Sequence, residues 1–65
     1  MPDSRLVIGS RWRKKGHPYS AVAIIHNVLK DRKSGWVTVY FYTPKTGVHH
    51  QWSQTHFLDK YYKIR

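Results

Sequence analysis

The sequence contains no cysteine, so neither a disulfide nor a thiolate metal site can stabilise the fold. It contains no glutamate either, and its acidic side chains are Asp3, Asp31 and Asp59, against twelve lysine and arginine residues. It also lacks an apolar run long enough for a signal peptide or for a membrane span of about 20 residues. From these absences we expect a cytoplasmic protein with no membrane partner.

The sequence features of enzymes and metal proteins are missing as well. There is no glycine-rich loop for a nucleotide phosphate, and no nucleophile elbow with a companion histidine and aspartate. The adjacent His49 and His50 would point to opposite faces of a strand, and no cysteine or glutamate is present to complete a tetrahedral metal site. We therefore expect no enzymatic activity, no bound metal and no cofactor.

The chain length limits the size of the fold. Its 65 residues suit one domain, which at this size buries only about 60% of the surface of the unfolded chain. We expect a single domain over residues 1–65, with residues 1–5 as a flexible N-terminus. Three tryptophan, five tyrosine and two phenylalanine residues supply the large apolar side chains that a small core needs.

Short segments rich in valine, isoleucine, threonine and aromatic residues recur along the chain, separated by turn residues, which is typical of antiparallel strands. The pattern predicts strands at residues 10–14, 19–28, 36–42, 48–52 and 61–64, with residues 5–8 as a short entry strand or lead-in. A helical or 3₁₀ turn over residues 55–60, capped by Ser53 or Thr55, precedes the last strand. The predicted fold is all-β, a small five-stranded antiparallel SH3-like barrel. An OB-like barrel is less favoured because it usually needs a longer chain.

Two of these strands carry information about the core. Both faces of the strand at residues 19–28 are largely apolar, which predicts a strand covered on both sides, as in a closed or nearly closed barrel. In the strand at residues 36–42, alternation places valine and phenylalanine on one face and Trp36, Tyr40 and Tyr42 on the other. The first face is the predicted core face, and the second is a candidate binding surface.

The order of these segments resembles a group of known proteins. The stretches "IGSRWRKKGHPYSAVAI", "GWVTVYFY" and "FLDKYYKI" are similar to small single-domain β-rich proteins of phages and bacteria, many of which have no assigned function. The resemblance implies a short β-rich domain of phage or prophage origin. It assigns no catalytic residue to any position of this sequence.

The formal net charge of +9 at pH 7 favours a polyanionic partner. Lysine and arginine side chains bind phosphates, and exposed aromatic rings stack with bases. The residues predicted to bind nucleic acid on these grounds are Arg11, Arg13, Lys14, Lys15, Lys30, Arg32, Lys33, Trp36, Tyr40, Tyr42 and Lys45. No helix long enough for a major groove is predicted, so we expect low sequence specificity, and DNA and RNA both remain open as ligands.

A protein partner is the alternative hypothesis. The chain would then be a phage-encoded interaction module or inhibitor that docks on an acidic host or virion protein, with Trp36, Tyr40, Tyr42 and Trp52 forming a peptide groove. The strand at residues 48–52 is a predicted sheet edge, which allows a weak homodimer as well as a monomer.

The nucleic-acid hypothesis predicts a strong dependence of affinity on salt. The logarithm of the affinity should fall linearly with the logarithm of the salt concentration, by about 0.7–0.9 per phosphate neutralised. The measurement is a binding titration over a series of salt concentrations. Failure to retain any nucleic acid at about 50 mM salt, where phosphate contacts are strong, would contradict the hypothesis.

Overall fold

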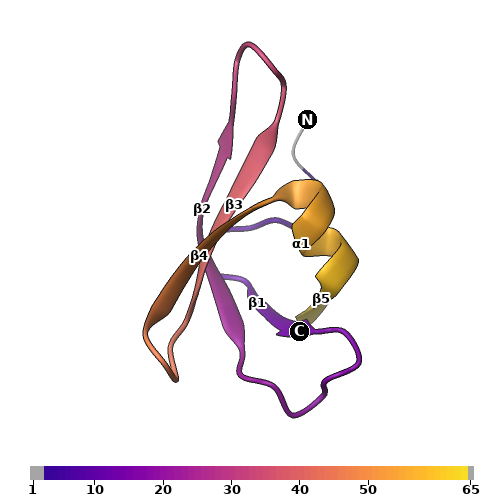
Figure 1. Ribbon diagram of the computed structural model, residues 1–65, viewed down its shortest axis with the longest axis vertical. Helices are drawn as coiled ribbons and strands as arrows, with labels where there is room; N and C mark the ends of the chain where they lie inside the picture. The colour runs from indigo at the N-terminus through magenta and orange to yellow at the C-terminus, as the bar shows by residue number, and fades with distance from the viewer. Residues whose placement is uncertain (1–2, 65) are drawn as a thin grey trace.

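The computed structural model describes residues 3–64, which form one antiparallel sheet and one short helix (Figure 1). The elements in chain order are β1 (Arg11–Lys14), β2 (Ala23–Lys30), β3 (Val37–Thr43), β4 (Val48–Ser53), α1 (Gln54–Lys60) and β5 (Tyr61–Ile64). The strand order in the sheet is β4-β3-β2-β1-β5, and every pairing is antiparallel. The prediction of five antiparallel strands with a helical element before the last one is confirmed. Within residues 3–64 the sheet is not closed, because β4 and β5 are its two edges.

The strand boundaries differ from the sequence prediction mainly near the N-terminus. Residues 5–8 form no strand; Leu6 is buried there, and its backbone N–H donates to the carbonyl of Asp3. β2 begins at Ala23 rather than at residue 19, because the turn after β1 continues through a hydrogen bond from Ser20 N–H to the His17 carbonyl. Tyr19, predicted to open the strand, is 99% exposed.

β2 is not buried on both faces, and a β-bulge explains the misleading pattern. Ile25 pairs with Phe41 while Asn27 pairs with Tyr40, so two steps along β2 match one step along β3, and His26 has no partner. The bulge reverses the alternation of side chains after Ile25. As a result Ile25 before the bulge and Val28 after it both pack toward the core, while His26 is exposed. Ile25 and Val28, which strict alternation assigns to two faces, therefore belong to one.

The core lies between the sheet and α1. Its fully buried large side chains are Trp12, Ile25, Val39, Phe41 and Phe57. The ring of Phe57, from α1, has its centroid 4.9 Å from those of Trp12, Phe41 and Tyr61. One short helix therefore covers the inner face of the sheet through a single aromatic side chain.

Local signals place the helix and the β3–β4 turn where the sequence predicts them. The Ser53 side chain accepts a hydrogen bond from His56 N–H, which satisfies one free donor at the start of α1. In the β3–β4 turn, the N–H groups of Thr46 and Gly47 both donate to the Thr43 carbonyl, and Gly47 has a φ of 73°. Glycine adopts this left-handed conformation without steric cost, so the hairpin closes tightly. No helix within residues 3–64 has the length and apolar character needed to cross a membrane.

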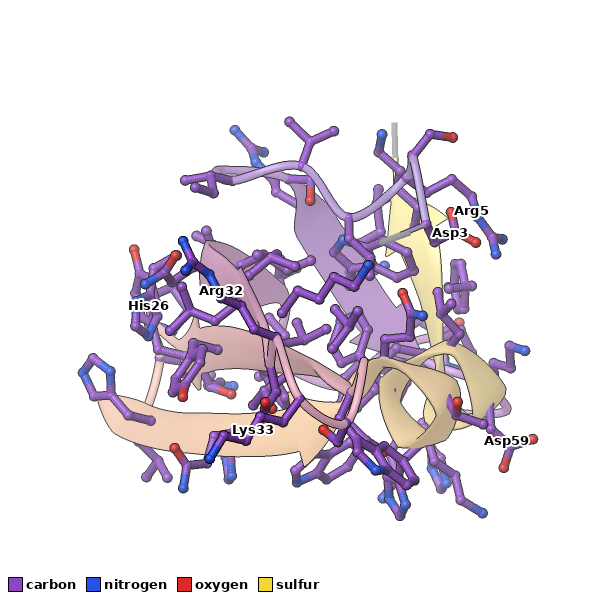
Figure 2. The ribbon with its side chains drawn as sticks, turned by 90° about the horizontal axis from the view of Figure 1, so that it is seen from above. Asp3, Arg5, His26, Arg32, Lys33 and Asp59 are labelled. Atoms are coloured by element: carbon purple, nitrogen blue, oxygen red, sulfur yellow. The ribbon has the colours of Figure 1, made fainter. Side chains whose placement is uncertain are left out.

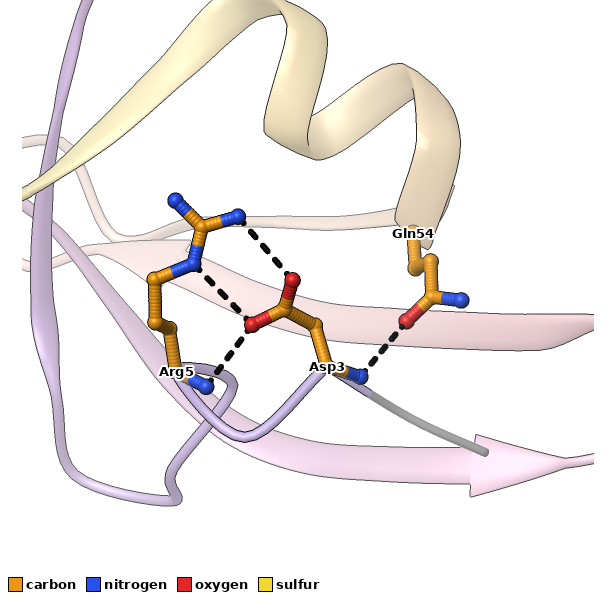
Figure 3. A network of polar contacts seen from close by, with 3 residues as sticks. All are labelled: Asp3, Arg5 and Gln54. Atoms are coloured by element: carbon orange, nitrogen blue, oxygen red, sulfur yellow. Dashed lines mark hydrogen bonds and ion pairs between the residues drawn. The ribbon is translucent and has the colours of Figure 1, made fainter.

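The segment before β1 is joined to α1 by polar contacts (Figure 3). Asp3 N–H donates to Gln54 Oε1 over 3.0 Å, and the Asp3 carboxylate accepts three hydrogen bonds from the backbone and guanidinium of Arg5. These hydrogen bonds to Arg5 lower the pKa of Asp3 from 3.8 to about 2. The flexible N-terminus is predicted for residues 1–5, of which residues 1 and 2 lie outside the described residues.

Truncation of Phe57 tests the role of the aromatic core. Phe57→Ala should destabilise the fold by about 3–5 kcal/mol, because it removes a fully buried ring and leaves a cavity. Thr55→Ala, at an exposed position of the same helix, should change the stability by less than about 0.5 kcal/mol. Urea denaturation of both variants measures the difference. Similar losses for the two variants would contradict the packing described above.

The contact between Asp3 and Arg5 predicts a pH effect. In the folded protein the Asp3 carboxyl should titrate with a pKa of about 2, and Arg5→Ala should raise this pKa toward 3.8. Because the folded-state pKa is the lower one, the stabilisation is present above pH 4 and is lost as the pH falls toward 2. NMR titration of the Asp3 side-chain carbon measures it, and an unchanged pKa in the variant would contradict the assigned cause.

Candidate nucleic-acid interface

The sheet has an outer face, on the side away from α1, that brings distant segments together. Residues directly opposite in antiparallel strands have their side chains on the same face. The register defines one such row across all five strands, and its members are Ile64, Arg11, Ile24, Tyr42 and His49. The neighbouring pairs on this face are Arg13 with Tyr62 and Tyr40 with Gln51. The predicted site residues Arg11, Arg13, Tyr40 and Tyr42 therefore share one surface.

Four rings on the outer face form a ring cluster, composed of His26, Tyr40, Tyr42 and His49. The His26 ring lies 6.2 Å from Tyr40, 6.0 Å from Tyr42 and 5.5 Å from His49, between ring centroids. Tyr42 and His49 are stacked, with centroids 5.5 Å apart and ring planes 23° from parallel. Both histidines are exposed and both tyrosines are half-buried, so the cluster is held by the sheet and open to a ligand.

Sequence reasoning missed the two histidines of the ring cluster. Alternation along the strand at residues 48–52 was a usable signal for His49, since it separates His49 and Gln51 from Trp52 and the core. The His50 side chain points to the inner face, where it stacks on the buried ring of Phe41, with centroids 5.1 Å apart. For His26 alternation gave only its side, the side of Ile24, and that side could not be recognised as the outer one because both predicted faces of the strand are largely apolar.

The cations of the outer face are not neutralised by nearby acids. Arg11 is exposed and Arg13 is half-buried, with a buried Nε that has no hydrogen-bond partner. Each of the three aspartates lies elsewhere: Asp3 is paired with Arg5, Asp59 is on α1 with Lys60 3.7 Å away, and Asp31 is in the β2–β3 loop. Figure 2 shows Asp3 and Asp59 on the side of α1 and His26 on the opposite side. Within residues 3–64, the arginines of the outer face therefore form no ion pair with an aspartate.

The β2–β3 loop carries a second set of predicted residues at one end of the molecule (Figure 1). Lys30, Arg32 and Lys33 are all exposed there, and Trp36 is 63% exposed. The loop has internal hydrogen bonds, from Asp31 N–H to the Trp36 carbonyl and from Lys33 N–H to Asp31 Oδ1, each 2.8 Å long. The cations and the indole ring are therefore presented by a defined turn.

The remaining predicted lysines lie at the other end of the sheet. Lys14 and Lys15 are at the end of β1 and in the loop that follows it, and Lys45 is in the β3–β4 turn. In an antiparallel sheet these connections lie opposite to the β2–β3 loop, as Figure 1 shows. The basic loops therefore do not meet at one edge. They flank the outer face from two ends.

The predicted peptide groove of four aromatic residues is not formed. Trp52 pairs with Val39 and packs on the inner side, with its ring 5.3 Å from Phe41 and 5.4 Å from Tyr61 between centroids. Tyr40 and Tyr42 are on the outer face, so the sheet separates them from Trp52. Strict alternation within each strand is the reason.

Two shallow hollows are associated with the outer face. The first, of about 360 Å³, lies over the ring cluster and is lined by His26, Tyr40, His49, His50 and Gln51. The second, of about 490 Å³, lies where β1 meets β5 and is lined by Gly9, Ser10, Arg11, Lys63 and Ile64. Within residues 3–64, no group of three or more histidine or aspartate side chains is placed to hold a metal ion.

Comparison of the chain with protein-family models, with curated proteins and with solved structures found no match.

Proposed function

We propose that this protein binds nucleic acid, DNA or RNA, through the outer face of its sheet and with low sequence specificity. The observation that carries the proposal is the composition of that face. Arg11 and Arg13 lie on the same face of the sheet as the ring cluster, and within residues 3–64 no aspartate lies in the strands that form this face. Cations that bind phosphates and accessible rings that stack with bases are the two features typical of proteins that bind single-stranded nucleic acid.

The two kinds of residue would have different roles. Arg11 and Arg13 neutralise phosphates and so supply the salt-dependent, sequence-independent part of the affinity. The ring cluster supplies stacking, which tolerates any base because every base has a π-face. Lys30, Arg32 and Lys33 at one end, and Lys14, Lys15 and Lys45 at the other, extend the positive surface along a longer ligand.

The only helix within residues 3–64 gives no means of reading base edges in a groove. α1 has seven residues, and its Phe57 is fully buried in the core. A helix that packs in this way cannot lie in a major groove as a recognition helix does. Binding directed by shape, backbone or stacking fits the fold better, which is why we propose low specificity.

We assign the fold to the SH3-like barrels as part of the same proposal. The support is the sequence of five short strands, a long β2–β3 hairpin and one helix before the last strand. The free edges of β4 and β5 mean that such a barrel is open on that side. Together with the resemblance to small phage and bacterial proteins, this makes the protein a candidate accessory factor of a phage or mobile element.

Fluorescence polarisation with labelled oligonucleotides at two salt concentrations tests the proposal. Arg11→Ala should weaken binding alike for all sequences and lower the salt slope by about 0.7–0.9, because one phosphate contact is lost. Lys60→Ala is the matched control: it removes the same charge from an exposed position on α1, away from the outer face, and should change the affinity much less. Equal effects of the two variants would contradict an interface on the outer face.

Binding of a protein partner is the second candidate function, and the free sheet edges favour it. The edge strands β4 and β5 each expose one row of backbone donors and acceptors that an extended segment can pair with. A pull-down from cell extract with and without nuclease separates the two functions. Partners that survive nuclease treatment support a protein interaction, and partners that disappear support nucleic-acid binding.

A further inference from the structure

We infer that the hollow over the ring cluster holds one unpaired base, so that the protein selects single-stranded over double-stranded nucleic acid. This inference rests on the proposed function and deepens it by naming the class of ligand. It depends on His26, His49 and Gln51, none of which the sequence analysis assigned to a site.

The hollow is assembled from three neighbouring strands. β2 contributes His26, β3 contributes Tyr40, and β4 contributes His49 and Gln51 as well as His50 at the rim. The bulge is essential to this arrangement, because it leaves His26 unpaired and turned out of the sheet over its neighbours. Since the partners come from different strands, unfolding or a shifted register would destroy the site.

The surroundings of the hollow suit a base and its phosphate. The rings of Tyr40, His26 and His49 offer aromatic surface for stacking, and the exposed amide of Gln51 can both donate and accept hydrogen bonds at a base edge. Arg11 is two strands away from Tyr42 in the same row, a distance of about 10 Å at the usual strand spacing. A strand with a base in the hollow therefore has its backbone within reach of this cation.

The geometry of the sheet favours a single strand over a duplex. In a duplex the flat faces of the bases are covered by their neighbours and their Watson–Crick edges are paired, so an aromatic surface reaches them only after unstacking. The ring cluster is a shallow feature of a strand surface, with no helix or wedge that opens a base pair. A single-stranded nucleic acid, whose bases are already unpaired, can stack on the ring cluster without the free-energy cost of opening a base pair.

A set of matched ligands tests the inference with the full-length protein. The three ligands are an intact single strand of about 12 nucleotides, the same strand with abasic sites in place of its bases, and the corresponding duplex. We expect the intact strand to bind about tenfold more tightly than the abasic strand, because the phosphates are the same and only stacking differs. DNA and RNA versions of the intact strand show whether the sugar matters.

Two protein variants locate the effect on the ring cluster. The double variant His26→Ala with His49→Ala should bind the intact strand about as weakly as the abasic strand, with its affinity for the abasic strand unchanged within about twofold. His17→Ala, at an exposed position in the loop after β1, is the matched control and should behave as the unaltered protein. Thermal unfolding confirms that each variant is folded before its affinity is compared.

The possible outcomes separate this inference from the proposed function. If intact and abasic strands bind equally, the inference is overturned together with the stacking role of the ring cluster, while nucleic-acid binding through Arg11 and Arg13 stands. If the duplex binds as tightly as the single strand, the inference alone is overturned. If His17→Ala has the same effect as the double variant, the inference is overturned as well. If no oligonucleotide binds at all, both fail. Preference for the intact single strand by the unaltered protein and by His17→Ala, but not by the double variant, supports both.

Discussion

The packing of Phe57 beneath the sheet is the interaction on which the rest of the structure depends. With no cysteine in the sequence, no disulfide assists this core. The seven-residue helix α1 brings the ring between Trp12, Phe41 and Tyr61, and so covers the inner face. The buried core cluster lies on this side of the sheet and includes no residue of the outer face. The outer face is available for charged and aromatic residues that face the solvent.

The parts of the fold that follow local rules could be predicted from the sequence. The turn with Gly47, the cap at Ser53, the last strand and the two faces of β3 are each set by neighbouring residues and by alternation. The start of β2 could not be predicted, because the turn after β1 continues through the hydrogen bond from Ser20 N–H to the His17 carbonyl, and the bulge could not, because it depends on the pairing of β2 with β3. In the sequence, apolar residues at both odd and even positions look the same whether the strand is buried on two faces or a bulge turns them to one face.

The candidate site shows the same division. Tyr40 and Tyr42 could be assigned to the outer face from alternation alone, and Arg11 and Arg13 from their place beside the buried Trp12. That these arginines and tyrosines lie on one surface could not be predicted, since it depends on the order of the strands in the sheet. Net charge gives no information on this point either. The lysines of the loops are distributed to two ends by the direction of the strands, and among residues 3–64 the lysine and arginine side chains that lie on the face itself are the arginines of β1.

The bulge leaves His26 as a residue of β2 that takes no part in strand pairing. Its neighbours in β2 have a cross-strand partner or pack in the core, whereas His26 does neither. The side chain at this position is therefore open to evolutionary change, because a substitution changes the chemistry of the outer face and leaves the register of Ile25 and Val28 in place. Deletion of His26 would leave Ile25, Asn27 and Val28 opposite Phe41, Tyr40 and Val39 in regular alternation, so the apolar interior would keep its register and the outer face would lose one ring.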